Sequence, residues 1–422
     1  METYTQVILK SFDGKTEVLQ SLCHSITDCD HSTPQWTPTG KIVVRNFNIK
    51  NGRLLLDKLS FTDEETFKTR TARSKPESGD LIITREAPMG EICIIPKGID
   101  CCLGQRVVLI KPNSEKIDSE YLLYAIQSEF VQKQIKKSEK TGSTVSNLRI
   151  PDLKAILIPV TKSQQKIASV LSVLDTKIEL NNRINTELEA MAKTLYDYWF
   201  VQFDFPDANG KPYKTSGGKM VYNAALKREI PDGWEAKQLS EIANITMGQS
   251  PDGESYNEDA QGTIFFQGST DFGWLFPTVR KYTTAPARMA KKGDILLSVR
   301  APVGDMNIAN NNCCIGRGLS ALNSKADFDG FLFYVMKYFK QVFDRRNTEG
   351  TTFGSITKDD LFSLKLAYPD EVLLKRYDDI VSNYNKIIFK RSLENQTLIE
   401  LRDYLLPMLM NGQVTVVNKG DI

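Results

Sequence analysis

Two runs of basic residues precede a segment that this 422-residue chain contains twice. The first run, FKTRTARSKPESGD, supplies Lys68, Arg70, Arg73 and Lys75 before any acidic residue. The second run, VRKYTTAPARMAKKGD, supplies Arg280, Lys281, Arg288, Lys291 and Lys292. A single charge run is usually a solvated surface, but two runs at equivalent positions predict two surfaces that bind nucleic-acid phosphates. Loops rich in Thr, Ser and Gly at 142–147 and 350–355 could donate further hydrogen bonds to phosphates.

Polar residues at the ends of short apolar runs differ between the two copies, although the apolar runs themselves agree. Arg45 corresponds to Gln267, and Gln105 corresponds to Arg317. Arginine prefers the edge of guanine, whereas Asn and Gln prefer the edge of adenine. The sequence therefore predicts two similar domains whose different tips read two different short sequences.

The candidate DNA-binding residues combine the basic runs, the tips, the Thr/Ser loops and the arginines of the repeated segment. Their side chains can donate hydrogen bonds to phosphates or to base edges. They are Arg45, Asn46, Asn48, Lys68, Arg70, Arg73, Lys75, Arg85, Arg106, Ser143, Thr144, Gln267, Ser269, Arg280, Lys281, Arg288, Arg300, Arg317, Thr351 and Thr352.

Motifs for catalysis are missing from the sequence. No phosphate-binding loop of the type GxxxxGK[ST] occurs. The chain has no Pro-Pro pair, which excludes the Asn/Asp-Pro-Pro-aromatic motif of amino-methyltransferases. The segment PDGWEAK at 231–237 is similar to a nuclease PD…ExK signature, but its short spacing cannot place the acidic groups on separate strands around a metal. We therefore expect no catalytic residue in this chain.

Four potential zinc ligands, Cys23, His24, Cys29 and His31, fall close together. Their spacing lacks the two separated ligand pairs of a structural zinc site, and adjacent residues such as Cys23 and His24 point in different directions. We expect a loop here and no bound metal. His31 remains a candidate for a hydrogen bond to a ligand or to the backbone.

The repeated segment reads GDLIITREAPMGE at 79–91 and GDILLSVRAPVGD at 293–305. CCLGQR follows the first copy and CCIGRG follows the second. A period of roughly 210 residues indicates a domain duplication, since solenoid repeats have much shorter periods. Each copy is expected to be mixed and rich in strands, with buried strands at 42–44, 81–84, 264–266 and 295–298. One helix is expected in each copy, at 119–137 and at 330–343.

A long helix is expected after each copy, at about 163–200 and about 371–410, because apolar residues recur there at helical spacing. The predicted stripes are Leu171, Ile178, Ala192 and Trp199 on the first helix, and Ile380, Ile387, Leu401 and Met408 on the second. Polar residues interrupt both at mid-length: Asn182 and Asn185, then Arg391 and Glu394. Two such helices would pair as a coiled coil whose polar layer fixes the register. Alternatively, each helix packs only on its own domain.

The expected fold is α+β: two similar strand-rich domains separated by two long antiparallel helices, as a pseudo-twofold tandem repeat. The expected segments are 1–162 for the first domain, 163–203 for the first helix, 204–232 for a connection, 233–370 for the second domain and 371–412 for the last helix. Hydrophobic residues make up 41% and charged residues 25% of the chain, with a net charge of +2. This composition is ordinary for a globular protein, and no apolar run is long enough for a membrane span. Adjacent cysteine pairs favour free thiols in a reducing cytoplasm.

The sequence resembles the specificity (S) subunit of type I restriction-modification systems over essentially its whole length. The motifs that carry the resemblance are the two GD…AP-x-G…CC-[LI]-G blocks, GW followed by LSEIANI, the helix QQKIASVLSVLDTKIELNNRINTELEAM, and LYDYWFVQFDFPD followed by SGGKMVYN. The first copy lacks the Gly-Trp pair that opens the second.

The resemblance implies two target-recognition domains, each reading one half of a split double-stranded DNA site. It also implies that the two helices set the spacing and dock two methyltransferase subunits, which use S-adenosylmethionine to methylate adenine at N6. A translocase-nuclease subunit that uses ATP and Mg is a further implied partner, and this chain itself is expected to bind no cofactor. The alternatives are a coiled-coil adaptor that binds no DNA, and the recognition part of a type II restriction-methylation enzyme.

Apolar residues surround the ends of both long helices, which predicts a second, partner-binding surface there. The candidate docking residues are Leu195, Tyr198, Trp199, Phe200, Leu405 and Met408. The alternative is that the adjoining hairpin of the same chain covers these side chains.

Overall fold

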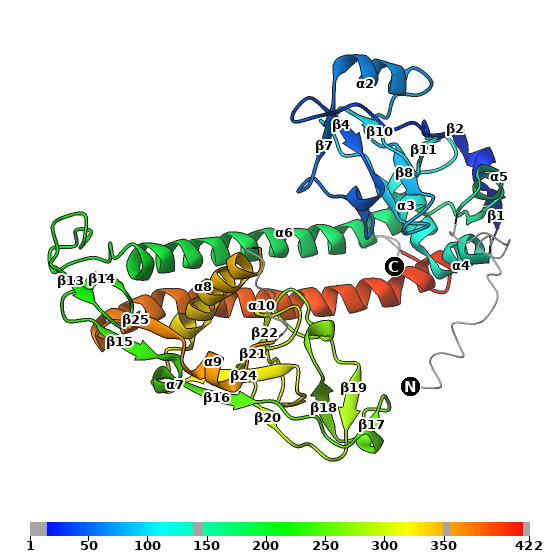
Figure 1. The fold of residues 1–422 in the computed structure, drawn as a ribbon. Coiled ribbons are helices and arrows are strands. Elements are labelled where there is room, and N and C mark those ends of the chain that lie inside the picture. Colours follow the sequence, from blue (N-terminus) through cyan, green and yellow to red (C-terminus); the bar gives the residue numbers. More distant parts are fainter. Residues whose placement is uncertain (1–14, 138–146, 349–354, 417–422) are drawn as a thin grey trace. The chain divides into compact units, whose positions relative to one another are not determined.

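The computed structural model describes residues 15–137, 147–348 and 355–416 and is drawn in Figure 1. The chain divides into two compact units. Unit 1 comprises Met1–Glu179 and Gln396–Ile422, and unit 2 comprises Leu180–Asn395. Each unit therefore contains one copy of the repeat together with a part of each long helix.

Unit 1 is built on two four-stranded sheets. The first is antiparallel, in the order β2 (Cys23–Asp28), β11 (Val107–Pro112), β8 (Leu81–Thr84) and β9 (Ile92–Ile94). The second has the order β10 (Cys101–Leu103), β4 (Lys41–Val44), β7 (Ser60–Thr62) and β3 (Trp36–Thr37), and β10 and β4 are parallel. The smaller pairs are β1 (Thr16–Val18) with β12 (Leu157–Pro159), and β5 (Ile49–Lys50) with β6 (Arg53–Leu54). The helices and 3-10 turns are η1 (Leu19–Leu22), η2 (Asn46–Asn48), α2 (Glu64–Thr71), α3 (Ser119–Gln127), α4 (Glu129–Lys137) and α5 (Ile150–Lys154).

Unit 2 repeats this plan. Its antiparallel sheet has the order β16 (Ala243–Met247), β24 (Leu319–Ser324), β21 (Ile295–Ser298) and β22 (Met306–Ile308). Its second sheet has the order β17 (Tyr256–Asn257), β19 (Lys281–Thr283), β18 (Thr263–Phe266), β23 (Cys313–Ile315) and β20 (Met289–Ala290), and β18 and β23 are parallel. The pairs are β13 (Met220–Asn223) with β14 (Arg228–Pro231), and β15 (Glu235–Gln238) with β25 (Lys365–Tyr368). The helices and turns are α7 (Leu239–Ile242), η5 (Gly253–Ser255), η6 (Ser269–Asp271), α8 (Asp329–Thr348) and α9 (Lys358–Phe362).

The repeated Gly-Asp segment has the same local structure in both units. Asp80 accepts a hydrogen bond from the Glu77 backbone N–H, and Asp294 accepts one from Lys291, both at 2.8 Å. These carboxylates close the turn that leads into β8 and β21, the fully buried strands predicted at 81–84 and 295–298. Each strand then runs to an Ala-Pro peptide that is cis in both copies. The predicted duplication is therefore confirmed at the level of strands and turns.

The helix expected at 119–137 is two helices in the structure, α3 and α4. Ser128 between them has an extended backbone, and its hydroxyl donates to the Ala125 carbonyl at 2.6 Å. Such side-chain bonds compete with helical ones and favour a break. In unit 2 the corresponding helix α8 is continuous and longer than expected.

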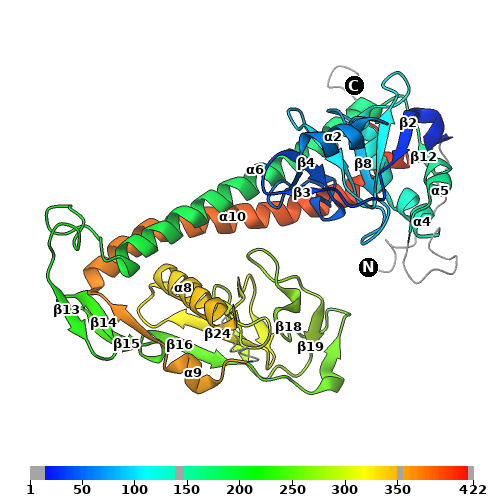
Figure 2. The same ribbon diagram turned by 45° about the horizontal axis from the view of Figure 1, so that its top comes forward.

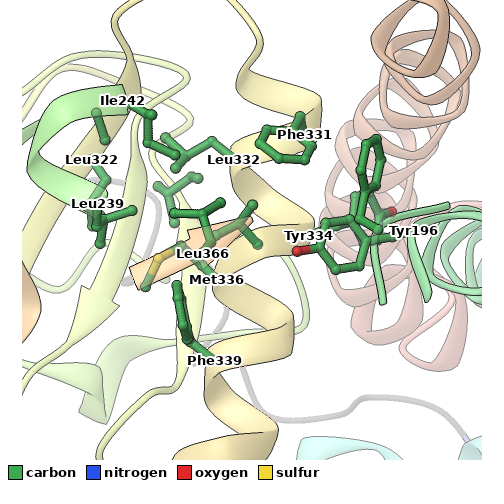
Figure 3. Close-up of a cluster of buried hydrophobic side chains, with 14 of the residues drawn as sticks. Tyr196, Leu239, Ile242, Leu322, Phe331, Leu332, Tyr334, Met336, Phe339 and Leu366 are labelled. Carbon is green, nitrogen blue, oxygen red and sulfur yellow. The ribbon is translucent and has the colours of Figure 1, made fainter. Parts of the chain in front are cut away.

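Helix α8 supplies much of the apolar core of unit 2. Figure 3 shows Leu332, Met336 and Phe339 of α8 lying among side chains from the sheet and short helices on one side, while Tyr334 lies toward Tyr196 of the long helix. Phe331 also contacts Tyr196, with ring centres 6.0 Å apart. In unit 1, α3 takes the equivalent place and buries six consecutive residues, Tyr121–Ile126. The sheets of each unit are thus attached to a long helix by one apolar helix.

The two long helices are α6 (Gln164–Tyr196) and α10 (Glu371–Met410). Helix α6 ends four residues before the expected residue 200, and a π turn at Asp197–Val201 follows it. Within each unit the helices lie side by side and run in opposite directions (Figures 1 and 2). In unit 1, Asp175 of α6 accepts from Arg402 of α10 at 3.0 Å. In unit 2, Tyr377 of α10 donates to the Ala192 carbonyl of α6 at 3.2 Å.

The predicted stripe of α6 is buried, but the predicted stripe of α10 is wrong. Ile380, Ile387 and Leu401 are 38–42% exposed. The buried row lies one residue further along the helix, at Leu374, Val381, Ile388, Asn395 and Leu409. Both rows repeat every seven residues, so periodicity alone could not distinguish them. Contact with the core of unit 2 determines which row is buried, because Leu373, Leu374 and Tyr377 pack in the same core as α8.

The predicted polar layer is present in unit 2. Asn181 donates to Glu394 at 2.8 Å and to Asn395 at 2.9 Å, and it accepts from Arg391 at 2.7 Å. Asn185 donates to Ser392 at 3.3 Å. The layer uses Asn181 in the buried position, and the predicted Asn182 is exposed, where its carbonyl oxygen accepts from Asn395.

Candidate nucleic-acid interface

The parallel strands of each unit end side by side and place the predicted tip residues together. In unit 1, β4 pairs with β10 so that Val44 lies opposite Leu103. In unit 2, β18 pairs with β23 so that Phe266 lies opposite Ile315. The residues that follow these strands form what we name the strand-end edge: 45–48 and 104–106 in unit 1, and 267–271 and 316–318 in unit 2. The register makes Arg45 equivalent to Gln267 and Gln105 equivalent to Arg317, as the sequence alignment of the copies indicated.

A glycine in each strand-end edge makes room for the tip side chain. Gly104 donates to the Val44 carbonyl and Gly316 to the Phe266 carbonyl, both at 2.8 Å. A Cβ on Gly104 would lie 3.1 Å from Cγ of Arg45, and a Cβ on Gly316 would lie 3.0 Å from Cδ of Gln267. Such distances are tighter than ordinary contacts, and backbone atoms are as close, at 2.9 Å for the Val44 carbonyl oxygen and 3.0 Å for Cα of Gln267. The repeated CC-[LI]-G glycine therefore lets the two strand ends approach each other closely.

Aromatic side chains surround Arg45 in unit 1. Its guanidinium carbon lies 5.1 Å from the ring centre of Trp36 and 4.6 Å from that of Phe47. Both rings are nearly half exposed, at 44% and 45%. Sequence reasoning missed these two residues. Two sequence features could have indicated them: Trp36 in QWTP, and Phe47 in NFN directly after the predicted tip residue Arg45.

Asn48 supports this turn from inside the domain and does not reach its surface. It is 1% exposed. Its side-chain oxygen accepts from the Arg45 backbone N–H at 3.0 Å, and its amide nitrogen donates to the carbonyls of Leu55 and Lys58. Asn48 is therefore corrected from a DNA contact to a structural residue. The neighbouring Asn46 donates to the Ala87 carbonyl at 2.7 Å, which ties the strand-end edge to the Ala-Pro turn.

Arg85 is also used inside the domain, so its predicted role as a DNA contact is withdrawn. Its guanidinium contacts both carboxylate oxygens of Asp28, at 2.7 and 2.9 Å, and donates to the Leu148 carbonyl at 3.1 Å. The equivalent residue in unit 2 is Val299, which is buried. The arginine thus replaces an apolar core residue by a paired charge. Arg106, in contrast, is exposed and contacts Glu86 at 3.3 Å.

The first basic run lies in and after α2, and its members have different environments. Arg70 is buried and donates to the carbonyls of Leu103, at 2.9 Å, and Ser32. It is therefore a structural residue and not a phosphate contact. Lys75 is exposed and pairs with Asp100 at 2.9 Å. Lys68 and Arg73 are exposed and remain candidates for phosphate binding.

In unit 2, Ser250 joins two tip residues of the strand-end edge. Gln267 donates from Nε2 to the Ser250 hydroxyl at 2.9 Å, and Arg317 donates from Nε to the same oxygen at 3.4 Å. Gln267 and Arg317 are exposed. Sequence reasoning missed Ser250, which precedes β17 in a loop without a recognisable motif. Arg300, the second residue after β21, is exposed, and Ser269 is half-buried.

The second basic run only partly matches the first. Lys281 in β19 lies opposite Phe265 of β18, and in unit 1 that register position belongs to Ser60. The predicted equivalence of Arg280 and Lys281 with the α2 cations is therefore wrong, because they precede the segment that α2 occupies. Arg280 pairs with Asp271, and Lys281 is exposed. Arg288 is exposed and lies between β19 and β20.

The predicted hydroxyl donors Ser143, Thr144, Thr351 and Thr352 lie outside the described residues. The residues that follow them are tied to the Ala-Pro segment in the same way in both units. Leu148 donates to the Arg85 carbonyl at 3.0 Å, and Ile356 donates to the Val299 carbonyl at 2.8 Å. Leu148 and Ile356 are therefore bound at equivalent strand ends.

The cluster of Cys23, His24, Cys29 and His31 does not assemble as a metal site. Within residues 15–137, 147–348 and 355–416, no group of three or more Cys, His, Asp or Glu side chains is arranged to hold a metal ion. Burial raises the pKa of the Cys23 thiol to about 12, which opposes the thiolate form that zinc requires. His31 is exposed and lies 3.3 Å from Asp28.

Two predicted docking residues, Trp199 and Phe200, are buried in unit 2 and are corrected here. Each is 5% exposed. Phe200 packs against Phe331 and Tyr377 with ring centres 4.9 Å apart in both pairs, and Trp234 also contacts it. The alternative named the adjoining hairpin as the cover, but these rings around Phe200 belong to α8, α10 and Trp234. Tyr198 is 37% exposed, and Leu195, Leu405 and Met408 are half-buried.

In the part of the chain that the structure describes, no helix combines the length and the apolar character needed to cross a membrane. Half of the large apolar side chains that are exposed in the described residues lie on the long helices. On α10 they are Val372, Ile380, Ile387, Leu393, Ile399, Leu401 and Tyr404.

Comparison with known proteins agrees with this architecture. The family model for the type I restriction modification DNA specificity domain matches residues 27–190 and 231–398. The chain is 30% identical over 388 residues to a type I restriction enzyme specificity subunit, MjaX, of Methanocaldococcus jannaschii, covering 89% of this chain and 88% of that protein. It is 27% identical to the MjaIX specificity subunit of the same organism, covering 84% and 81%.

A solved structure shares the fold. It is the type I restriction-modification system S subunit from M. genitalium, with a TM-score of 0.57 and 18% identity over 95% of this chain and 97% of that one. Each of the two family-model matches spans one recognition domain and most of the long helix that follows it. The chain therefore belongs to the type I restriction modification DNA specificity family.

Proposed function

We propose that this chain reads a two-part DNA sequence, with one recognition domain for each half, as the specificity subunit of a type I restriction-modification complex. The observation that carries the proposal is the strand-end edge. The two edges share strand register, the glycine beneath the tip and the Ala-Pro turn, but they differ in the tip side chains, Arg45 and Gln267. A conserved backbone with exchanged polar tips is what two readers of different sequences require.

The phosphate contacts proposed for unit 1 are Lys68, Arg73 and Arg106, and those for unit 2 are Lys281, Arg288, Arg300 and Arg317. All of these side chains are exposed. They would supply the electrostatic, sequence-independent part of the affinity. The edge side chains would supply the sequence-dependent part.

The long helices would set the distance between the half-sites and dock two methyltransferase subunits. Helix α6 has 33 residues and α10 has 40, which correspond to about 50 and 60 Å at the helical rise. Two major-groove sites one turn of DNA apart are separated by about 34 Å. The exposed apolar pair Ile380 and Ile387 in unit 2 is the surface we assign to a docking partner, because no second apolar row is needed for the helix pair itself.

The chain is proposed to carry no catalytic residue and to act in the cytoplasm. S-adenosylmethionine would then be bound by the methyltransferase subunits, and ATP and Mg by the translocase-nuclease subunits. A coiled-coil adaptor that binds no DNA is the competing function.

Reconstitution with the methyltransferase of the same system tests the proposal. The complex should methylate adenine only within a motif of two short sequences separated by unread bases, and methylation should require this chain. A complex that methylates without this chain, or a chain that associates with the methyltransferase but leaves its sequence preference unchanged, would contradict the proposal and favour an adaptor.

A further inference from the structure

We infer that Arg45 and Gln267 each decide one base pair of the DNA site, guanine in the first half-site and adenine in the second. The inference rests on the proposed function and adds to it the residues and the bases. Four features of the structure carry it: the shared position, the shared glycine, the two aromatic rings beside Arg45, and the hydroxyl that contacts Gln267.

The two side chains leave the same point of the fold. Arg45 directly follows β4 and Gln267 directly follows β18, and each strand is paired in parallel with the strand that carries the repeated Cys-Cys. The glycine opposite each tip, Gly104 or Gly316, lies so close that a Cβ would press on the tip side chain and on the adjacent backbone. The fold therefore holds the tip residue in the same place in both units, whereas the side chain at that place differs.

The surroundings of Arg45 leave its guanidinium N–H groups available to a ligand. Within the described residues it makes no ion pair, unlike Arg85 or Arg280 in the same fold. Trp36 and Phe47 lie within 5.1 and 4.6 Å of the guanidinium carbon. Stacking on rings occupies the faces of the guanidinium and leaves the N–H donors along its edge. A guanidinium held in this way can donate two parallel hydrogen bonds to O6 and N7 of guanine with little further loss of rotamer entropy.

The environment of Gln267 suits an amide that reads adenine. One N–H of its amide donates to Ser250 at 2.9 Å, which fixes the plane of the group. Its carbonyl oxygen also lies 3.3 Å from the same hydroxyl and can accept from it, and Gln267 is exposed. With its second N–H and the remaining lone pair of the carbonyl oxygen, the amide can donate to N7 and accept from N6 of adenine. Arg317, which shares the Ser250 hydroxyl, would contact the neighbouring phosphate or base.

Exchange of the two side chains tests the inference. Arg45→Gln and Gln267→Arg chains would each be assembled with the methyltransferase subunit, and bound DNA would be selected from pools in which one half-site is randomised and the other is kept. Arg45→Gln should change one position of the first half-site from guanine to adenine and leave the second half-site unchanged. Gln267→Arg should do the reverse. Each original preference should fall by about 5- to 150-fold.

Further variants distinguish base reading from charge and from misfolding. Arg45→Lys keeps the charge but loses the planar fork, so the guanine preference should fall by less than in Arg45→Gln, because an ammonium group can also donate to O6 and N7. Weaker binding in Arg45→Gln with the guanine preference retained would assign Arg45 to a phosphate and overturn the inference. Lys97→Gln and Gln261→Arg make the same charge changes at exposed positions away from the edges and should select the wild-type motif.

The outcomes separate this inference from the proposed function. A wild-type complex that selects no two-part motif contradicts the proposed function itself. A wild-type motif that persists in both exchange variants contradicts only the assignment of Arg45 and Gln267. Loss of binding to every member of the pool, with thermal unfolding unchanged, also contradicts it, because the intact second half-site and the phosphate contacts should retain binding.

Discussion

Asn181 of α6 and Asn395 of α10 are linked by a side-chain hydrogen bond across the helix pair. Asn181 donates to the Asn395 side chain at 2.9 Å, and Asn395 donates to the Asn182 side chain at 2.8 Å. Both Asn181 and Asn395 are buried. A polar layer of this kind costs desolvation but has satisfied partners only in one register, which is its best-attested use in paired helices.

Substitutions within this layer should have unequal effects. Asn181→Leu removes the partner of Arg391, Glu394 and Asn395 at once, and we expect it to lower the free energy of unfolding by about 1–3 kcal/mol. Asn185→Leu should be neutral or stabilising, because its side-chain oxygen has no partner and its single hydrogen bond is 3.3 Å long. Denaturant unfolding of the two variants measures the difference. Equal losses in both would show that the layer does not act through Asn181.

The phosphate surface should depend on the exposed cations of the first run and not on its buried one. Replacing Lys68 and Arg73 together with Ala should flatten the slope of log affinity against log salt by up to about 0.9 per lost contact. Arg70→Ala should instead destabilise unit 1, since two carbonyls lose their donor. Binding titrations at several salt concentrations, with unfolding curves in parallel, separate the two cases. An unchanged slope in the double variant would remove α2 from the DNA surface.

Substitutions of exposed and of buried residues at the long helices should have different effects, the first on partner docking and the second on stability. Ile380→Asp with Ile387→Asp should weaken co-purification with the methyltransferase subunit and leave thermal unfolding nearly unchanged, because both positions are exposed. Trp199→Ala should lower stability by about 3–5 kcal/mol, because it empties a site in the apolar core. Normal complex formation by the double Asp variant would move the docking surface elsewhere.

The spacing function predicts the effect of lengthening the helices. A four-residue insertion after Glu187, matched by one before Lys390, adds about 6 Å to each helix and keeps the apolar rows nearly in phase. It lies outside the polar layer, which stays paired. The unread spacer of the methylated motif should lengthen by about one or two base pairs, with both half-sites unchanged. A changed half-site with a fixed spacer would mean that the helices do not set the distance.

The sequence predicted the features that repeat and failed on features that depend on a neighbour. The strands at 81–84 and 295–298, the long helices and the polar layer follow from periodicity, and the structure has them. The buried row of α10 could not be chosen, because two rows of equal period exist and only the contact of Tyr377 with the domain core selects one.

The candidate site shows the same limit. Tips such as the half-buried Arg45 and the exposed Arg317 were found because the two copies differ there. Asn48, Arg70 and Arg85 have the same residue types as DNA contacts, but their partners are carbonyls and a carboxylate that come close only after folding. Trp36 and Ser250 belong to no motif, and only their distances to Arg45 and Gln267 identify them.

The most direct test of the account is a chain in which both recognition domains have the sequence of the first. Residues 233–370 would be replaced by a second copy of residues 15–162, and the adenines methylated by the assembled complex would be mapped across a genome. If each domain reads its own half-site, the second half-site sequence should disappear, and both halves of the new motif should carry the first half-site sequence. A motif that still contains the original second half-site would contradict the account.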